Sequence, residues 1–383
     1  MKLVVQVKLQ PTPEQASALE ATLRACNAAA RAVAQTARGV DVYRNYDLRK
    51  HVYADIREDH ALGAQAAQHV IKKVCDAYRT LKANLRAGNY GKPGSKRHRR
   101  VAAAPIGFRW DAAQPYDARM LSWQCDARTV SIWTTAGRLK GVAYTGSADQ
   151  LKAVATLPVG ESDLVHRDGM WLLYATVEVT EADPVEPQGF LGVDMGIVQI
   201  ATDSDGTVCA GAQLNRYRRR QIRLRAKLQA KQTESARRLL ARRSRRESRH
   251  AANVNHVISK SIVAEAERTS RGIAVEALTG IRARVRLRKP QRAALHCWSF
   301  AQLGEFLTYK ARRAGVPLVQ VDPRYTSQTC CKCGHRDKRN RPDQATFSCR
   351  SCGVVAHADV NAAVNIAQRG ADGWGAVNRP HVA

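Results

Sequence analysis

The hydrophobic positions of the first hundred residues change from a strand-like to a helix-like pattern. Apolar and polar residues alternate in LVVQVKL, which predicts a strand over 3–9. A helix should begin directly afterwards, because Thr12, Pro13 and Gln15 have the spacing of an N-cap, a first helical residue and a capping-box partner. A second helical pattern covers roughly 61–87. We therefore expect one strand followed by a small helical unit.

Short alternating runs then dominate the chain from about 105 to 182, and turn signals separate them. This pattern is typical of an antiparallel, barrel-like β domain. The strand at 3–9 has no partner within the helical unit, so we expect it to join this barrel, which makes the helices an insertion. The basic segment 89–100 contains turn formers and is interpreted as a flexible, solvated linker or a loop that contacts nucleic acid. The segment 182–189 is interpreted as a second linker.

The second half mixes apolar strands with helical stretches. Residues 190–206 suit a strand and a hairpin partner that ends at Asp205–Gly206, and a long helical region should run from about 213 to 270. The expected elements after it are a strand at 272–278, a basic loop at 282–292, a helix near 298–314, a strand at 317–323 and a final helix at 358–370 that stops at Gly370.

The charge of the chain indicates a polyanionic partner. Its 383 residues include 62 Lys and Arg against 33 Asp and Glu, a formal net charge of +29. Solubility requires far less charge, whereas a nucleic acid would neutralise it. No apolar run approaches the roughly 18 residues of a membrane span, and Lys2 and Lys8 interrupt the first apolar segment, unlike a signal peptide. We expect a protein of the prokaryotic cytoplasm or nucleoid, without a membrane partner.

Five of the ten cysteines lie between Cys330 and Cys352, which predicts a metal site. Cys330 and Cys333 form one C-x2-C pair, and Cys349 and Cys352 form a second pair after fifteen intervening residues. Four thiolates at this spacing suit one tetrahedral Zn²⁺. Such a site leaves no position for water, so the zinc should be structural. Cys331 breaks the spacing and is expected to be dispensable.

Three acids stand in contexts that suggest a second metal site. Asp194 lies within an apolar strand, Glu276 ends another strand, and Asp359 opens the final helix. Each alone could be an ordinary strand-end or helix-start charge. Together they could hold two catalytic Mg²⁺ ions at a phosphodiester.

The segment Arg216–Arg249 is the most basic stretch of the chain. It carries fifteen Lys or Arg and two acids, Glu234 and Glu247. Mutual repulsion would destabilise such a helix in isolation, so phosphate binding explains it better than an ordinary solvated face. The residues that we expect to contact nucleic acid are Arg218, Arg219, Arg220, Arg223, Arg242, Arg243, Arg245 and Arg246.

Several motifs resemble the TnpB family of transposon-encoded proteins, relatives of the type V CRISPR effectors. KLQPTPEQ, followed by a helix with Asn27, resembles the start of the family; GVDMGI resembles its first RuvC segment; and NHVISKSIV with IAVEAL resembles its second. YKARRAGVPLVQVDPRYTSQTCCKCG, FSCRSCG and ADVNAAVNI resemble the third segment with its inserted zinc ribbon. The chain departs from the family at Ala277, where a second acid is frequent, and at Cys331, where a small polar residue is frequent.

The resemblance implies a multidomain α+β protein. It consists of a wedge-type β-barrel with an inserted helical recognition unit, then an RNase H-like (RuvC) α/β domain with an inserted zinc ribbon. The implied segments are the first barrel strand at 1–10, the helical unit with its basic linker at 11–104, the barrel at 105–188, RuvC segments I and II at 189–327, the ribbon for target nucleic acid at 328–356, and RuvC segment III with the C-terminal tail at 357–383.

The function implied by the resemblance is that of an RNA-guided DNA endonuclease with the catalytic triad Asp194, Glu276 and Asp359. Its partners would be a guide RNA transcribed from the end of a transposon and target double-stranded DNA beside a short flanking motif; a monomer is favoured. Two alternatives remain open at this point. The chain could be an RNA-guided DNA-binding regulator that does not cut, or a transposase or accessory protein of a mobile element.

Overall fold

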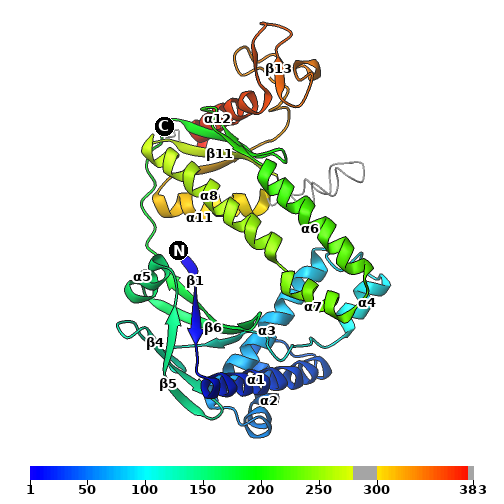
Figure 1. Cartoon of the computed structure of the whole chain (residues 1–383), viewed down its shortest axis with the longest axis vertical. Helices are drawn as coiled ribbons and strands as arrows, with labels where there is room; N and C mark the ends of the chain where they lie inside the picture. Colours follow the sequence, from blue (N-terminus) through cyan, green and yellow to red (C-terminus); the bar gives the residue numbers. More distant parts are fainter. Residues whose placement is uncertain (279–299, 378–383) are drawn as a thin grey trace, which may run out of the picture. The chain divides into compact units, whose positions relative to one another are not determined.

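The chain forms two compact units, Met1–Val179 and Thr180–Ala383. The structure is a computed structural model, which describes residues 1–278 and 300–377 (Figure 1). The basic loop expected at 282–292 lies outside the described residues. The finer domain boundaries expected from the sequence stay predictions.

The first unit contains a nearly closed sheet of seven strands in the order β2-β6-β7-β1-β5-β4-β3. Strand β1 (Lys2–Gln10) pairs antiparallel with both β7 (Met170–Glu178) and β5 (Gly137–Thr145). The strand expected at 3–9 therefore does join the later β segment, as predicted. The other strands are β2 (Gln114–Tyr116), β3 (Leu121–Gln124), β4 (Thr129–Thr134) and β6 (Val159–Arg167).

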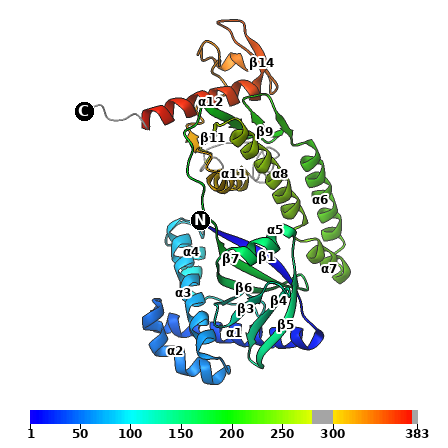
Figure 2. The same cartoon turned by 90° about the vertical axis from the view of Figure 1, so that its left-hand side faces the viewer.

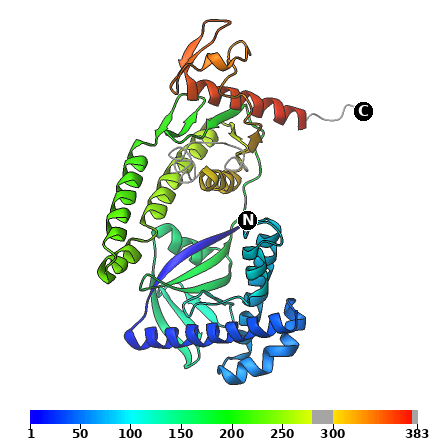
Figure 3. The same cartoon turned by 90° about the vertical axis from the view of Figure 1, so that its right-hand side faces the viewer.

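Helix α1 (Pro13–Gly39) begins at the predicted capping box. The Thr12 hydroxyl accepts the Gln15 amide at 3.3 Å, and the Gln15 side-chain oxygen accepts the Thr12 amide at 3.0 Å. Figure 3 shows α1 and α2 (Asn45–Asp59) at one end of the curved sheet, and α3 (Ala64–Arg86) beside it.

Two further helices of this unit were not expected. Helix α5 (Ala148–Thr156) lies between β5 and β6. Helix α4 (Lys96–Ala103) begins inside the segment 89–100, so the interpretation of this whole segment as a flexible linker or loop was wrong for residues 96–100. Ser95 caps α4 by accepting the His98 amide, so a local N-cap overrides the repulsion among the basic side chains.

The second unit is built on a five-stranded sheet in the order β10-β9-β8-β11-β12. Strand β8 (Phe190–Asp194) pairs in parallel with β11 (Gly272–Glu276), which pairs in parallel with β12 (Leu318–Val321). On its other side β8 pairs antiparallel with β9 (Gln199–Asp203), and β10 (Val208–Ala210) completes the edge. The predicted hairpin and the strands at 272–278 and 317–323 are therefore present.

Helices cover both faces of this sheet (Figure 2). Leu191 and Val193 pack in the core that includes α8 (Arg246–Arg268) and α11 (Phe300–Ala314). Phe190 packs on the opposite face, in the core that includes Ile366 of α12 (Ala358–Val377). Because side chains alternate along a strand, Asp194 shares the α12 face with Phe190 and Gly192.

Helix α12 approaches the sheet through two glycines. A Cβ atom at Gly192 would lie 1.9 Å from the Ala363 carbonyl oxygen, and one at Gly370 would lie 2.6 Å from the Ala274 Cβ atom. The prediction that Gly370 ends the final helix is wrong, because α12 continues to Val377. Gly370 instead lies within α12 and permits this helix to pack closely on the sheet.

The basic region expected as one long helix is divided into three. Helix α6 (Ala212–Ala230) ends before α7 (Glu234–Arg243), and Arg245, with a φ of 64°, precedes α8. The ribbon segment contains a short 3-10 helix (Lys338–Asn340) and the paired strands β13 (Thr346–Ser348) and β14 (Val355–His357). Among the described helices, none is both long and apolar enough for a membrane span.

Candidate active site and metal centre

The fold brings the three predicted acids to one face of the second sheet. Val193 pairs with Val275, so Asp194 and Glu276, the next residue on each strand, end neighbouring parallel strands at the same edge. Both share the face that α12 covers. Asp359 is the second residue of α12, and its charge acts on Asp194.

Burial and mutual repulsion make this site unfavourable for negative charge. Burial, followed by the charges of Glu276 and Asp359, raises the pKa of Asp194 to about 7. Burial also raises the pKa of Glu276 above its ordinary value. Carboxylates that are desolvated and repel one another fit a hard divalent cation, which would supply the missing positive charge. The ligand atoms of the three carboxylates are spaced more widely than those of the four cysteines. Among the described residues, the cysteines are the group whose ligand atoms lie close enough together to hold a metal ion as they stand.

Two further residues contact the acids and were missed in the sequence. Thr326 is buried, and its hydroxyl donates a 2.6 Å hydrogen bond to Glu276 Oε1. Arg341 lies in the ribbon segment between the two cysteine pairs, and its guanidinium donates to Asp359 Oδ1 at 3.0 Å. Neither residue has a periodic or spacing signal. Thr326 lies within the TnpB-like motif that leads into the ribbon, which was an available indication, whereas Arg341 lies outside the motifs.

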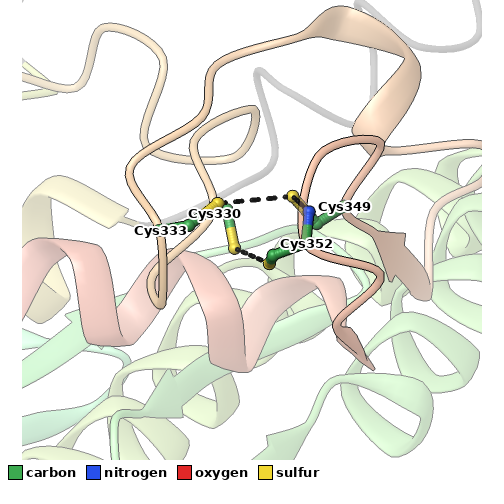
Figure 4. A group of neighbouring side chains, drawn as sticks. All are labelled: Cys330, Cys333, Cys349 and Cys352. Carbon is green, nitrogen blue, oxygen red and sulfur yellow. Dashed lines mark hydrogen bonds between the residues drawn. The ribbon is translucent and has the colours of Figure 1, made fainter.

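The four predicted zinc ligands converge at one point (Figure 4). All four sulfur atoms lie within 4.8 Å of one another. Cys330 and Cys352 are 3.7 Å apart, and Cys333 and Cys349 are 3.6 Å apart. A tetrahedral Zn²⁺ with Zn–S bonds of ~2.3 Å requires sulfur atoms about 3.8 Å apart. The site therefore fits one structural zinc ion, and Cys331 is outside the group, as predicted.

The surrounding backbone favours the thiolate form of Cys349. The amides of Cys352 and Ser351 both donate to the Cys349 sulfur at 3.4 Å. These hydrogen bonds hold the pKa of the Cys349 thiol below its usual range, at about 6. Asn340 is buried between the pairs, where it donates to the His335 carbonyl and accepts the Arg350 amide. The cysteine loops are thus connected to each other without the metal.

Helix α12 also holds the first cysteine loop. Asn361 donates to the Thr329 carbonyl at 2.8 Å and accepts the Cys331 amide at 3.0 Å. Asn365, one turn later, donates to the carbonyls of Thr326 and Thr329. One helix therefore carries the third acid and fixes both the ribbon and the residue that contacts Glu276.

The basic residues of α6 and α7 are mostly exposed, with one exception. An open hollow of about 700 Å³ is lined by Arg216, Arg219, Arg220, Arg223, Lys227 and Arg243, together with Leu224. Arg242, Arg245 and Arg246 are also exposed. Arg218, which was expected to contact nucleic acid, is buried and lies 3.6 Å from Glu247, so it does not belong to this surface.

Comparison with known proteins shows which families the chain resembles. Residues 174–280 match a family described as a probable transposase, OrfB of IS605 type, and residues 300–366 match the Cas12f1-like TNB domain. The matched regions contain Glu276, the four cysteines and Asp359. They confirm the resemblance to TnpB-like proteins that the motifs predict.

Individual relatives agree with this resemblance. The putative RNA-guided DNA endonuclease InsQ of Escherichia coli is 31% identical over 61% of this chain and 61% of its own length. A TnpB-like protein of Methanocaldococcus jannaschii is 32% identical over 44% of this chain and 64% of its own. The CRISPR-associated endodeoxyribonuclease Cas12f1 of Sulfoacidibacillus thermotolerans is 43% identical over 30% of this chain and 26% of its own. The chain thus matches less than two thirds of each of these relatives.

A solved structure shares the fold. The cryo-EM structure of a Cas12f1–sgRNA–target DNA complex matches 91% of this chain and 82% of that chain, with a TM-score of 0.57 and 14% sequence identity. The mixed α/β fold of this chain is therefore one that a solved protein structure also has.

Proposed function

We propose that this protein is an RNA-guided DNA endonuclease that cleaves target DNA at a RuvC-type site formed by Asp194, Glu276 and Asp359. The observation that carries the proposal is the meeting of these acids at one sheet edge beneath α12, where burial and repulsion raise the pKa of Asp194 to about 7. The relative named as a putative RNA-guided DNA endonuclease supports the same activity.

The three carboxylates would hold two Mg²⁺ ions. When bound, these ions would activate water and stabilise the leaving oxygen of the phosphodiester. The residues of the chain would prepare the site. Thr326 orients the Glu276 carboxylate through its hydrogen bond, and Arg341 places a cation beside Asp359, where a phosphate oxygen could also be contacted.

The basic surface would bind the nucleic acids. The hollow along α6 presents six cationic side chains, which suit a phosphate backbone in any sequence. Sequence selection would then come from pairing between the guide RNA and the target strand, while the protein reads a short flanking motif. The ribbon would hold one structural Zn²⁺ and contact the target nucleic acid.

The test compares cutting with binding. Asp194→Ala, Glu276→Ala and Asp359→Ala ribonucleoproteins should each lose cleavage in Mg²⁺ by orders of magnitude while their target affinity in gel shifts is retained. Asp205→Ala is the matched control, because Asp205 lies in the same unit and pairs with Arg271. Exchange of the guide segment of the RNA should redirect cutting. Undiminished cleavage by all three variants, or cleavage that ignores the guide, would refute the proposal.

A further inference from the structure

Helices α6, α7 and α8 line a second hollow, which shares Leu224 and Arg243 with the open basic hollow on α6. Helices α6 and α8 pack against each other, and α7 connects them (Figure 1). The hollow measures about 510 Å³, and all of its walls belong to the second unit. This size is within the range of small-ligand sites, about 300–1,000 Å³.

A buried cation, Arg218, forms part of the wall of this hollow. Arg218 is 8% exposed and lines the hollow, yet its Nε atom has no hydrogen-bond partner among the described residues. Glu247 lies 3.6 Å away, which is close enough for an ion pair but too far for a hydrogen bond. The Nε atom is itself shielded from solvent, so a bound anion would compensate the charge of the guanidinium rather than accept a hydrogen bond from Nε.

The other charges around the hollow also favour an anion. Arg225, Arg243 and Arg245 line it together with Arg218, and Glu247 is the one acidic residue in its wall. Gln221 fixes Arg243 through a 3.2 Å hydrogen bond.

The start of α8 adds further donors to the same wall. Arg245 provides no side-chain cap to this 23-residue helix, and Ser248 of the first turn lines the hollow. Amides at a helix N-terminus attract anions, phosphate in particular.

The wall of the hollow also contains apolar side chains, and these favour one kind of anion. Leu224, Leu228 and Leu240 face the same space as the arginines. A free inorganic ion would make no apolar contact with these leucines. A nucleotide offers a phosphate to the guanidinium groups and a flat base that can pack on the leucines. We propose that this hollow binds one phosphate-bearing nucleotide, with Arg218 and Arg243 as its phosphate contacts.

Two sources share this chemistry: a nucleotide of the bound guide RNA and a free mononucleotide. The first source depends on the proposed function, but the site itself does not. Adenosine 5′-monophosphate, adenosine and inorganic phosphate should therefore be titrated calorimetrically into the purified ribonucleoprotein, before and after digestion of its RNA, at constant ionic strength. In parallel, RNA–protein photocrosslinking of the intact ribonucleoprotein should identify peptides of α6 and α8.

The monophosphate should bind with one site and more tightly than adenosine or phosphate alone. Binding before digestion would indicate a free nucleotide. Binding only after digestion, together with crosslinks to these helices, would indicate the guide RNA. Arg218→Gln and, independently, Arg243→Gln should weaken binding, or the crosslink, about tenfold or more through the loss of a charge-assisted hydrogen bond.

Arg238→Gln is the matched control, because it removes the same charge from an exposed position of α7 that does not line the hollow. The control should bind like the unaltered protein. The proposal is overturned if no saturable binding and no crosslink occur, or if the Arg218 and Arg243 variants both bind like the control. Guide-directed cleavage is measured separately on the same preparations. A failure of the proposed endonuclease activity can therefore be distinguished from a failure of nucleotide binding in this hollow.

Discussion

Asp194→Asn should stabilise the protein in the absence of divalent cations while it abolishes cleavage. Asp194 is partly buried at the end of β8, where Glu276 and Asp359 oppose its ionisation. Asn has nearly the same shape but no charge, so it removes this repulsion. The three carboxylates would then lower the stability of the metal-free protein, and this cost would be linked to metal binding.

The magnitude follows from the pKa of Asp194, which rises from an ordinary 3.8 to about 7. Since the unfolded chain releases this proton at lower pH than the folded chain, the stability of the native protein falls as pH rises from about 4 to 7 and then stays constant. The full difference corresponds to about 4 kcal/mol. Because a buried Asn amide retains a desolvation penalty, we expect a gain of about 1–3 kcal/mol at pH 8, or several degrees in unfolding temperature.

The assay is thermal unfolding of the ribonucleoprotein in EDTA at pH 8 and at pH 5. The gain of Asp194→Asn over the unaltered protein should be largest at pH 8 and less than half as large at pH 5. Asp205→Asn is the opposite control, because Arg271 lowers the pKa of Asp205, so this change should destabilise the protein at pH 8. Added Mg²⁺ should stabilise the unaltered protein more than Asp194→Asn. Equal stability of the two at pH 8 in EDTA would refute the reasoning.

Three further predictions concern the surroundings of the site. Cys331→Ser should retain one zinc per chain by metal analysis, whereas Cys330→Ser should lose it and loosen the ribbon; the reverse result would show that the ligands are misassigned. Thr326→Ala should raise the Mg²⁺ concentration needed for half-maximal cleavage, because Glu276 loses its 2.6 Å hydrogen bond. Thr326→Ser, which keeps the hydroxyl, should need the same Mg²⁺ concentration as the unaltered protein; an unchanged Mg²⁺ requirement in Thr326→Ala would exclude a positioning role. Gly192→Ala should lower stability by about 1–3 kcal/mol in denaturant unfolding and reduce cleavage, because its Cβ atom would meet α12; unchanged values would contradict the close packing.

The sequence determined the elements whose causes are local. Alternation predicted β1, and apolar runs predicted four of the five strands of the second sheet, all except β10. The Thr12 capping box fixed the start of α1, and cysteine spacing identified the candidate metal-binding group together with the surplus Cys331. Alternation and the capping box act over a few neighbouring residues. The cysteine signal needs only the spacing of four residues of one type. Local signals also misled. The long basic helix is divided before α7, where the Thr233 hydroxyl caps the new helix by accepting the Ala236 amide, a local signal that we missed. Gly370 was interpreted as a helix end, but it lies within α12 against Ala274 of β11, a neighbour that is remote in sequence.

Only the tertiary structure decided what surrounds the acids and which arginines are exposed. Thr326 reaches Glu276 across fifty positions of sequence, and Arg341 reaches Asp359 from inside the ribbon. Arg218 resembles its neighbours in a basic run, yet it is buried against Glu247 because its side of α6 faces α8. Periodicity reports which positions share a face but not what the face meets. The partner of a side chain is set by the packing of whole elements, so these contacts could be found only in the fold.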